Sequence, residues 1–306
     1  MAEWAEIIVP VGAAEVDEIA ALIAEEVPAA AAGTEQRGDE VVFWVPVQLV
    51  AAALTSTRDA VAKWAANGAS VDPTKVRSAS AIGEAEWHSW KKFFKTTRLT
   101  RQFVVVPSWD EYTPTADDII INLDPGMAFG TGKHASTRLV LEHMQVMADA
   151  GLNPLRVLDV GCGSGILSIA AVKRWADATA VALDRDPIAV QACAQNALLN
   201  QVANRIDSSQ TPLAEFSEHF PLVLANIQAH VLRDLKEKLV ARTAAPGQLF
   251  DKDGAVLPNG GTLVMSGLLT TQAQAIADEF VTAGMKLVRI RASTDDPQWS
   301  SVVLEK

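Results

Sequence analysis

The chain has 306 residues, which is long enough for two domains, and its 49% of apolar residues can form a sizeable core. Its charged fraction of 21% is ordinary for globular proteins and excludes disorder over most of the chain. The net charge of −11 disfavours direct nucleic acid binding, which needs a basic face, and suits a basic protein partner.

The N-terminus and the cysteines predict a soluble cytoplasmic protein. The first six residues include acidic side chains where a signal peptide has basic ones, and no apolar run is long enough to span a membrane. Cys162 and Cys193 are too few for a disulfide framework and lack the spacing of metal ligands. We therefore expect reduced thiols, no metal site, no membrane contact and a monomer.

Residues 1–80 predict a small α+β domain. Apolar and β-branched runs over residues 6–11 and 41–47 predict strands. Apolar residues at helical spacing over 16–27 and 51–64 predict helices. Strand, helix, strand and helix in so short a span are typical of part or all of a ferredoxin-like fold. This domain contains no residue pattern that indicates catalysis.

A linker region is expected over residues 81–102, with a helix over 84–95. One stripe of this helix is aromatic, from Trp87, Trp90, Phe93 and Phe94. The stripe predicts packing on a domain, and the alternative is a helix that docks a substrate.

The remaining residues, 103–306, predict an α/β domain with a doubly wound, mostly parallel sheet, because strand patterns alternate with helical ones. The expected strands are 157–160, 178–183, 222–225 and 261–266, and the expected helices include 166–174 and 187–200. Residues 243–256 are rich in Gly, Asp and Pro and predict a surface loop.

A glycine-rich turn, VLDVGCGSG at residues 157–165, joins the first of these strands to a helix. Gly161, Gly163 and Gly165 let the backbone approach a ligand, beside the free N–H groups of the helix N-terminus. The spacing is not that of the dinucleotide fingerprint, whose third glycine would be at Ile166. Residues 126–133 are similar to a phosphate-binding loop, but the first glycine is misplaced by one residue and His134 replaces the magnesium-binding Ser or Thr.

Two polar residues at strand ends are candidate ligand contacts. Asp184 follows the strand at 178–183, where a carboxylate can accept hydrogen bonds from ribose hydroxyls. Asp186 is the competing candidate, or alternatively the N-cap of the helix that begins at Pro187, and only the strand-end position favours Asp184. Asn226 ends the strand at 222–225, where its amide can accept an N–H from an amine or can simply form a turn.

These motifs, with DPGMAFGTGKHAST at residues 124–137, resemble those of the ribosomal protein methyltransferase family that modifies large ribosomal subunit protein eleven. The resemblance covers roughly residue 84 to the end. It implies a Rossmann-like, class I methyltransferase fold that binds S-adenosylmethionine. The implied cofactor contacts are Thr137, Gly161, Gly163, Asp184 and Asn226, with Phe129, Gly130 and Thr131 in a loop that closes over the site.

The resemblance also implies an N-methyltransferase for lysine side chains, the N-terminal α-amine, or both, of that ribosomal protein. Asn226 is the expected catalytic residue, which positions the amine, and the N-terminal domain would dock the substrate. His134 is either a general base or a structural brace of the loop. The alternatives are a methyltransferase for a small-molecule amine or a nucleic acid base, and a non-catalytic cofactor-binding module.

Overall fold

The computed structural model describes residues 4–12, 15–30, 34–79, 95–124, 132, 134–250 and 256–306. They form two compact units, an N-terminal unit within the first 95 residues and a C-terminal unit made of Thr96–Asp124 and Gly132–Lys306. The helix expected over 84–95 lies outside the described residues, apart from Lys95. In the part of the chain that is described, no helix is both long and apolar enough to cross a membrane.

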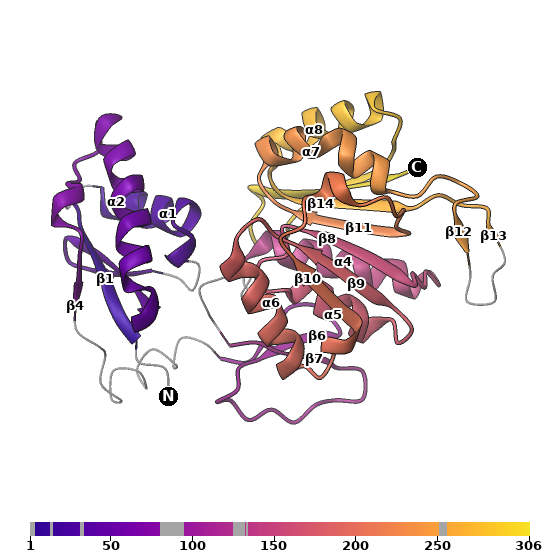
Figure 1. Ribbon diagram of the computed structural model, residues 1–306, viewed down its shortest axis with the longest axis horizontal. Coiled ribbons are helices and arrows are strands. Elements are labelled where there is room, and N and C mark those ends of the chain that lie inside the picture. Colours follow the sequence, from indigo (N-terminus) through magenta and orange to yellow (C-terminus); the bar gives the residue numbers. More distant parts are fainter. Residues whose placement is uncertain are drawn as a thin grey trace. The chain divides into compact units, whose positions relative to one another are not determined.

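The N-terminal unit is a four-stranded antiparallel sheet with two helices (Figure 1). Its elements are β1 (Trp4–Pro10), α1 (Val16–Glu26), β2 (Glu35–Arg37), β3 (Glu40–Pro46), α2 (Val50–Ala66) and β4 (Arg77–Ala79). The strand order β2-β3-β1-β4 is that of a split βαβ unit, so the ferredoxin-like prediction is confirmed. Alternation along β1 buries Ile7 and Val9 against Ile19 and Ile23 of α1.

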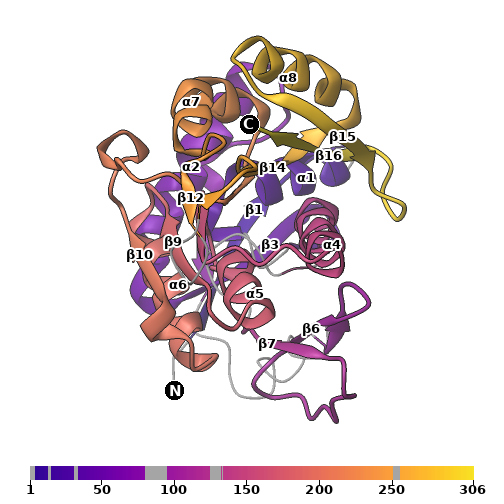
Figure 2. The same cartoon turned by 90° about the vertical axis from the view of Figure 1, so that its right-hand side faces the viewer.

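The C-terminal unit contains a seven-stranded sheet with the order β10-β9-β8-β11-β14-β16-β15. Its strands are β8 (Arg156–Val160), β9 (Thr179–Leu183), β10 (Ile206–Ser209), β11 (Leu222–Asn226), β14 (Thr262–Leu269), β15 (Lys286–Ala292) and β16 (Trp299–Glu305). The first five in this order are parallel, and β16 is antiparallel to both of its neighbours. Figure 2 shows β10 and β15 at opposite edges. The strand order reverses between β8 and β11, which is where open α/β sheets bind ligands.

Helices cover both faces of this sheet, as Figure 1 shows. On one face lie α4 (Ala135–Asp149), α5 (Ile166–Arg174) and α6 (Pro187–Leu199), and on the other lie α7 (Ala229–Arg242) and α8 (Thr270–Thr282). In β11, Leu222 and Leu224 face α4 and α5, whereas Val223 and Ala225 face α7 and α8. Burial on both faces explains why the central strands β8, β9 and β11 are mostly apolar along their length, and the doubly wound prediction is confirmed.

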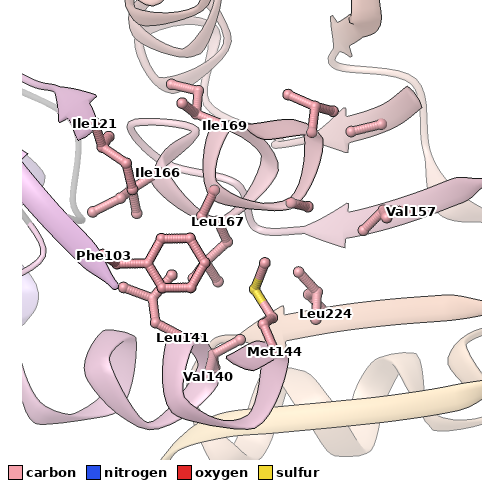
Figure 3. Packing of buried hydrophobic residues seen from close by; sticks show 14 of the residues in the cluster. Phe103, Ile121, Val140, Leu141, Met144, Val157, Ile166, Leu167, Ile169 and Leu224 are labelled. Atoms are coloured by element: carbon pink, nitrogen blue, oxygen red, sulfur yellow. The ribbon is translucent and has the colours of Figure 1, made fainter. Parts of the chain in front are cut away.

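A smaller sheet covers the outer side of α4 and α5. It consists of β5 (Thr97–Arg98), β6 (Phe103–Val106) and β7 (Ile119–Asn122), with β6 and β7 parallel. Figure 3 shows the ring of Phe103 pointing into the core between these helices, with Leu141 of α4 and Ile166 and Leu167 of α5 around it. This packing fixes the ends of α4 and α5 that border the candidate site.

The surface loop predicted over residues 243–256 is only partly correct. Thr243 and Ala244 are buried, because the Ala244 N–H donates to the Phe220 carbonyl and the Gly261 N–H donates to the Ala244 carbonyl. Further along, β12 (Leu249–Phe250) pairs with β13 (Val256–Leu257). Gly, Asp and Pro signal turns, but they do not reveal backbone pairing with distant residues.

Candidate active site

The glycine turn after β8 takes a conformation that suits only glycine. Gly161, Gly163 and Gly165 have φ angles of +74°, +52° and +78°. A Cβ on Gly161 would lie 2.3 Å from Cγ2 of Ile227, and one on Gly165 would lie 2.5 Å from Sγ of Cys193. The N–H groups of Gly161 and Cys162 donate to the Leu183 carbonyl, at 2.8 and 3.0 Å. The turn is therefore fastened to the end of β9, and its backbone is open to close approach by a ligand.

Asp184 and Asp186 have different roles in the structure. The Asp184 carboxylate accepts from the Gly163 N–H through Oδ2 and from the Asp186 N–H through Oδ1, both at 3.0 Å. Asp186 is the N-cap of α6, since its Oδ1 accepts from the Ile188 N–H at 2.9 Å, with Pro187 in the first turn. The carboxylate beside the glycine turn is thus that of Asp184, and Asp186 serves the helix.

Asn226 ends β11 and reaches the first turn of α4. Its Nδ2 donates to Oγ1 of Thr137 at 3.2 Å, and Thr137 is 1% exposed. Its Oδ1 is buried and finds no hydrogen-bond partner among the described residues. An unsatisfied buried acceptor costs about 1–3 kcal/mol, so this oxygen is suited to a donor on a bound molecule.

His134 acts as the N-cap of α4. Its Nδ1 accepts from the Ser136 N–H at 3.2 Å and lies 2.7 Å from the Ser136 hydroxyl. Its ring meets that of Trp299 edge to face, with centroids 4.5 Å apart. Burial lowers the pKa of His134, against the smaller opposing effect of Asp296. Because the Nδ1 lone pair is engaged by the Ser136 N–H, the neutral ring carries its proton on Nε2 and has no free lone pair for a proton from a substrate, so the geometry favours the brace over the general base.

The cofactor contacts predicted for the loop before α4 are those of Phe129, Gly130 and Thr131. These three residues lie outside the described residues, as does Lys133. Gly132 is described, and its φ is +84°. A Cβ there would lie 2.8 Å from Cδ1 of Leu99 and 2.9 Å from Cδ1 of Ile166, so the C-terminal end of the loop packs at the start of α5.

Asp159 is a buried carboxylate to which sequence reasoning assigned no role. Its Oδ2 accepts from the N–H and the hydroxyl of Ser168, at 3.1 and 2.7 Å, and its Oδ1 has no partner in the described part of the chain. Burial raises the pKa of Asp159 to about 6, and the charge of Asp184 acts in the same direction. The available signal was an acid inside an apolar strand, two residues before the glycine turn.

Neither metal ligation nor thiol chemistry finds support at this site. Within the described ranges, no group of three or more His, Cys, Asp or Glu side chains is arranged to hold a metal ion. Cys162 and Cys193 are buried free thiols. A hydrogen bond with Cys193, together with burial, raises the pKa of Cys162 far above its usual value, which suppresses the nucleophilic thiolate.

Several known proteins that are similar to this chain share one description. Residues 3–306 match the family described as ribosomal protein L11 methyltransferase (PrmA). The ribosomal protein L11 methyltransferase of Geotalea daltonii is 37% identical over 237 residues, which is 74% of this chain and 69% of that protein. That of Herpetosiphon aurantiacus is 35% identical, over 70% of this chain and 68% of its own length. The crystal structure of ribosomal protein L11 methylase from Lactobacillus delbrueckii subsp. bulgaricus has a TM-score of 0.56 and 30% identity, and covers 69% of this chain and 98% of that one.

Proposed function

Because the chain belongs to the ribosomal protein L11 methyltransferase family, we propose that it methylates amines of ribosomal protein L11 with S-adenosylmethionine. The amines are those of lysine side chains, the N-terminal α-amine, or both. The observation that carries the proposal is the buried Oδ1 of Asn226, which has no partner among the described residues and lies at the carboxyl edge of the sheet. We propose that this Oδ1 accepts a hydrogen bond from the N–H of the substrate amine.

The described residues fit S-adenosylmethionine. The turn at Gly161 and Gly163 has positive φ angles and no Cβ atoms, so its backbone can lie close to a ligand, and Asp184 beside it can accept from both ribose hydroxyls. Thr137 supplies a hydroxyl from α4. Phe129, Gly130 and Thr131 are proposed to close over the cofactor. When bound, S-adenosylmethionine supplies an electrophilic methyl group on a sulfonium.

The residues of this chain contribute mainly by positioning. Since Nδ2 of Asn226 is engaged by Thr137, its Oδ1 is the end of the amide that receives the amine N–H. This contact, with the backbone near Ile227, aims the nitrogen lone pair at the reacting carbon. The nucleophile must be an uncharged amine, and its proton leaves to water before transfer. Holding the reactants in line at near-attack distance accounts for the rate.

The alternative acceptors have less support. Methyltransferases that act on flipped bases have an aromatic residue shortly after the Asn, as in N-P-P-[FY], whereas here Ile227 and Gln228 follow Asn226, and Ile227 packs over Gly161. A module that only binds the cofactor would need Asp184 but would have no use for a buried amide oxygen at Asn226 that no described residue engages. A small-molecule amine would not require the N-terminal unit.

We assign docking of L11 to the N-terminal domain, residues 1–80, with residues 81–102 as the linker and residues 103–306 as the catalytic domain. The protein is proposed to act as a cytoplasmic monomer, without direct contact to nucleic acid or membrane; the net charge of −11 suits a basic protein substrate. A chain beginning at Thr96 should still bind S-adenosylmethionine and lose activity on L11. Full activity of that truncated chain would remove the docking role.

The activity is tested by incubating the protein with purified L11 and S-adenosylmethionine carrying a deuterated methyl group. Peptide mass spectrometry should find the label on lysine side chains or on the α-amine, and at the same early time point should find much less of it with Asn226→Ala, whose kcat is expected to be lower by about one to three powers of ten. Label that appears only on RNA or on a small amine offered in the same mixture would contradict the proposal.

A further inference from the structure

Ser266 of β14 lies beside the candidate site, where no sequence motif drew attention to it. We infer that Ser266 is a positioning residue for methyl transfer: it holds the first turn of α4 so that Thr137 can fix the amide of Asn226. The inference rests on the proposed function, because it assigns Asn226 the task of orienting the amine.

Ser266 and Asn226 are partners in the register of two adjacent parallel strands, β14 and β11. Alternation puts both on the face of the sheet that α4 covers, in line with Val264 and Leu224, which belong to the core on that side. Each donates one hydrogen bond to α4. Asn226 donates to the Thr137 hydroxyl at 3.2 Å, and the Ser266 hydroxyl donates to the Ser136 carbonyl at 2.9 Å.

The two accepting residues, Ser136 and Thr137, are consecutive in the first turn of α4. A shift of the Ser136 carbonyl therefore carries the Thr137 hydroxyl with it. Helix ends fray unless they are held, and the segment just before this turn is the loop expected to close over the site. Ser266 is 0% exposed, and a fully buried serine hydroxyl normally needs its hydrogen bond, because a buried polar group without a partner is costly.

The chain just after Ser266 is also shaped around the site. The pairing of β14 with β16 shifts between Met265 and Leu268, which marks a bulge, and Gly267 there has a φ of +79°. A Cβ on Gly267 would lie 2.8 Å from the Ile227 carbonyl oxygen. The bulge thus brings the backbone of β14 directly against the residue that follows Asn226.

The consequence of losing this brace follows from the chemistry of an amide. If Thr137 moves, Nδ2 of Asn226 is released and the amide can turn about its last torsion. It would then present N–H groups to an amine instead of its Oδ1, and the amine would lose its orientation. The cofactor contacts proposed for Gly161 and Asp184 come from other strands and are kept, so cofactor binding should weaken only through Thr137 and Asn226, and by less than turnover falls.

The kinetic test compares Ser266→Ala with Ser301→Ala. Ser301, on β16, is a matched control. It is also 0% exposed, and its hydroxyl lies 2.8 Å from Nε2 of His143. We expect Ser266→Ala to lower kcat about tenfold, the scale of a slightly misplaced reactant. The Kd for S-adenosylhomocysteine should rise only about two- to threefold, less than kcat falls, because Thr137 and Asn226 shift while the contacts of Gly161 and Asp184 remain. Ser266→Cys, which keeps the size and a weak donor, should give an intermediate kcat, and it decides the matter if the alanine variant does not fold.

A double-mutant cycle and a cofactor-free measurement complete the test. Ser266→Ala should have no further effect on kcat in an Asn226→Ala background, because it acts through Asn226. In protein with ¹⁵N-labelled asparagine, the Asn226 side-chain amide signals, assigned by their loss in Asn226→Ala, should shift or broaden with Ser266→Ala and not with Ser301→Ala.

An unchanged kcat in both Ser266 variants, full additivity with Asn226→Ala, or unmoved amide signals would overturn the inference. Failure of wild-type protein to methylate L11 would instead overturn the proposed function, and the amide signals would still report on Ser266.

Discussion

Asn226 and Thr137 are 89 positions apart in the chain, yet the Asn226 side chain donates to the Thr137 hydroxyl at 3.2 Å. The contact determines which end of the amide is engaged within the protein and which end is left for a ligand. It also links the end of β11 to the first turn of α4, the helix that follows the DPGMAFGTGKH segment. The strand-end amide and the signature segment therefore belong to one site.

Asp184→Ala should weaken binding of S-adenosylmethionine by about 100-fold or more, because it removes two hydrogen bonds to a charged group that contribute about 1.5–3 kcal/mol each. Titration calorimetry measures this Kd. Asp186→Ala is the matched control: it should lower the free energy of unfolding by about 1 kcal/mol through loss of the α6 cap, with little change in Kd. Equal affinities for the two variants, or tight binding of NADH by wild type, would refute the assignment of Asp184.

Gly161→Ala should abolish measurable cofactor binding, because the new Cβ would meet Cγ2 of Ile227 at 2.3 Å. Gly151→Ala controls for backbone strain. Gly151 also has a positive φ, +89°, and a Cβ there would have no described heavy atom within 4 Å. Both variants should lose about 1–2 kcal/mol of stability from the left-handed conformation, but only Gly161→Ala should lose the cofactor. Normal binding by Gly161→Ala would show that the turn does not approach a ligand.

His134→Ala should lower the thermal stability by about 1 kcal/mol and reduce turnover modestly, because α4 loses its N-cap. The pH–rate profile should keep its shape, since Nδ1 of His134 is engaged as the cap of α4 and the ring is not expected to take a proton from the amine. His134→Asn, with another good capping residue, should restore much of the stability. If the pH–rate profile of His134→Ala instead lacked an ionisation that the wild type shows near the ordinary His pKa of about 6.5, His134 would be a general base.

His143 should make the stability depend on pH. Burial, together with the charges of Arg291 and Arg289, lowers its pKa to about 4. Above a pH of about 6.5 the imidazole is mostly neutral in both the folded and the unfolded chain, so the lowered pKa takes little from the free energy of unfolding. As the pH falls toward 4, the unfolded chain takes up a proton that the folded chain does not, so stability is lost. Between pH 7 and pH 5 this amounts to about 2 kcal/mol.

Urea unfolding of His143→Gln and wild type at both pH values isolates this effect. Asp159, whose pKa is raised, acts in the opposite direction but is the same in both proteins. The wild type should lose about 2 kcal/mol more than His143→Gln on acidification. Parallel pH dependences of wild type and His143→Gln would contradict a buried, neutral imidazole.

Much of the fold was predictable because its strands are apolar runs that end abruptly. The runs that precede Gly161, Asp184 and Asn226 define β8, β9 and β11, and they place the candidate residues at one sheet edge. The short strands β2 and β4 were not predicted, because Glu35–Arg37 and Arg77–Ala79 are polar and partly exposed, and only pairing with neighbours makes them strands.

The site was predictable in its residues but not in its connections. Glycine spacing and the family signature indicated Gly161, Asp184 and Asn226, whereas nothing local in the sequence links Asn226 to Thr137 or Ser266 to Ser136. These contacts span 89 and 130 residues and depend on how α4 packs on the sheet. The two roles considered for Asp186 also needed the structure, because an N-cap is recognised by its hydrogen bond to Ile188.

The measurement that tests the account most directly is the turnover of Asn226→Ala on L11 at saturating cofactor and substrate. Orientation acts in the transition state, so its loss should lower kcat by about one to three powers of ten. The Kd for S-adenosylmethionine should rise less than it does in Asp184→Ala, because one amide contact is weaker than a carboxylate that holds two hydroxyls. Normal turnover by Asn226→Ala would contradict the mechanism and leave the methyl acceptor without a positioning residue.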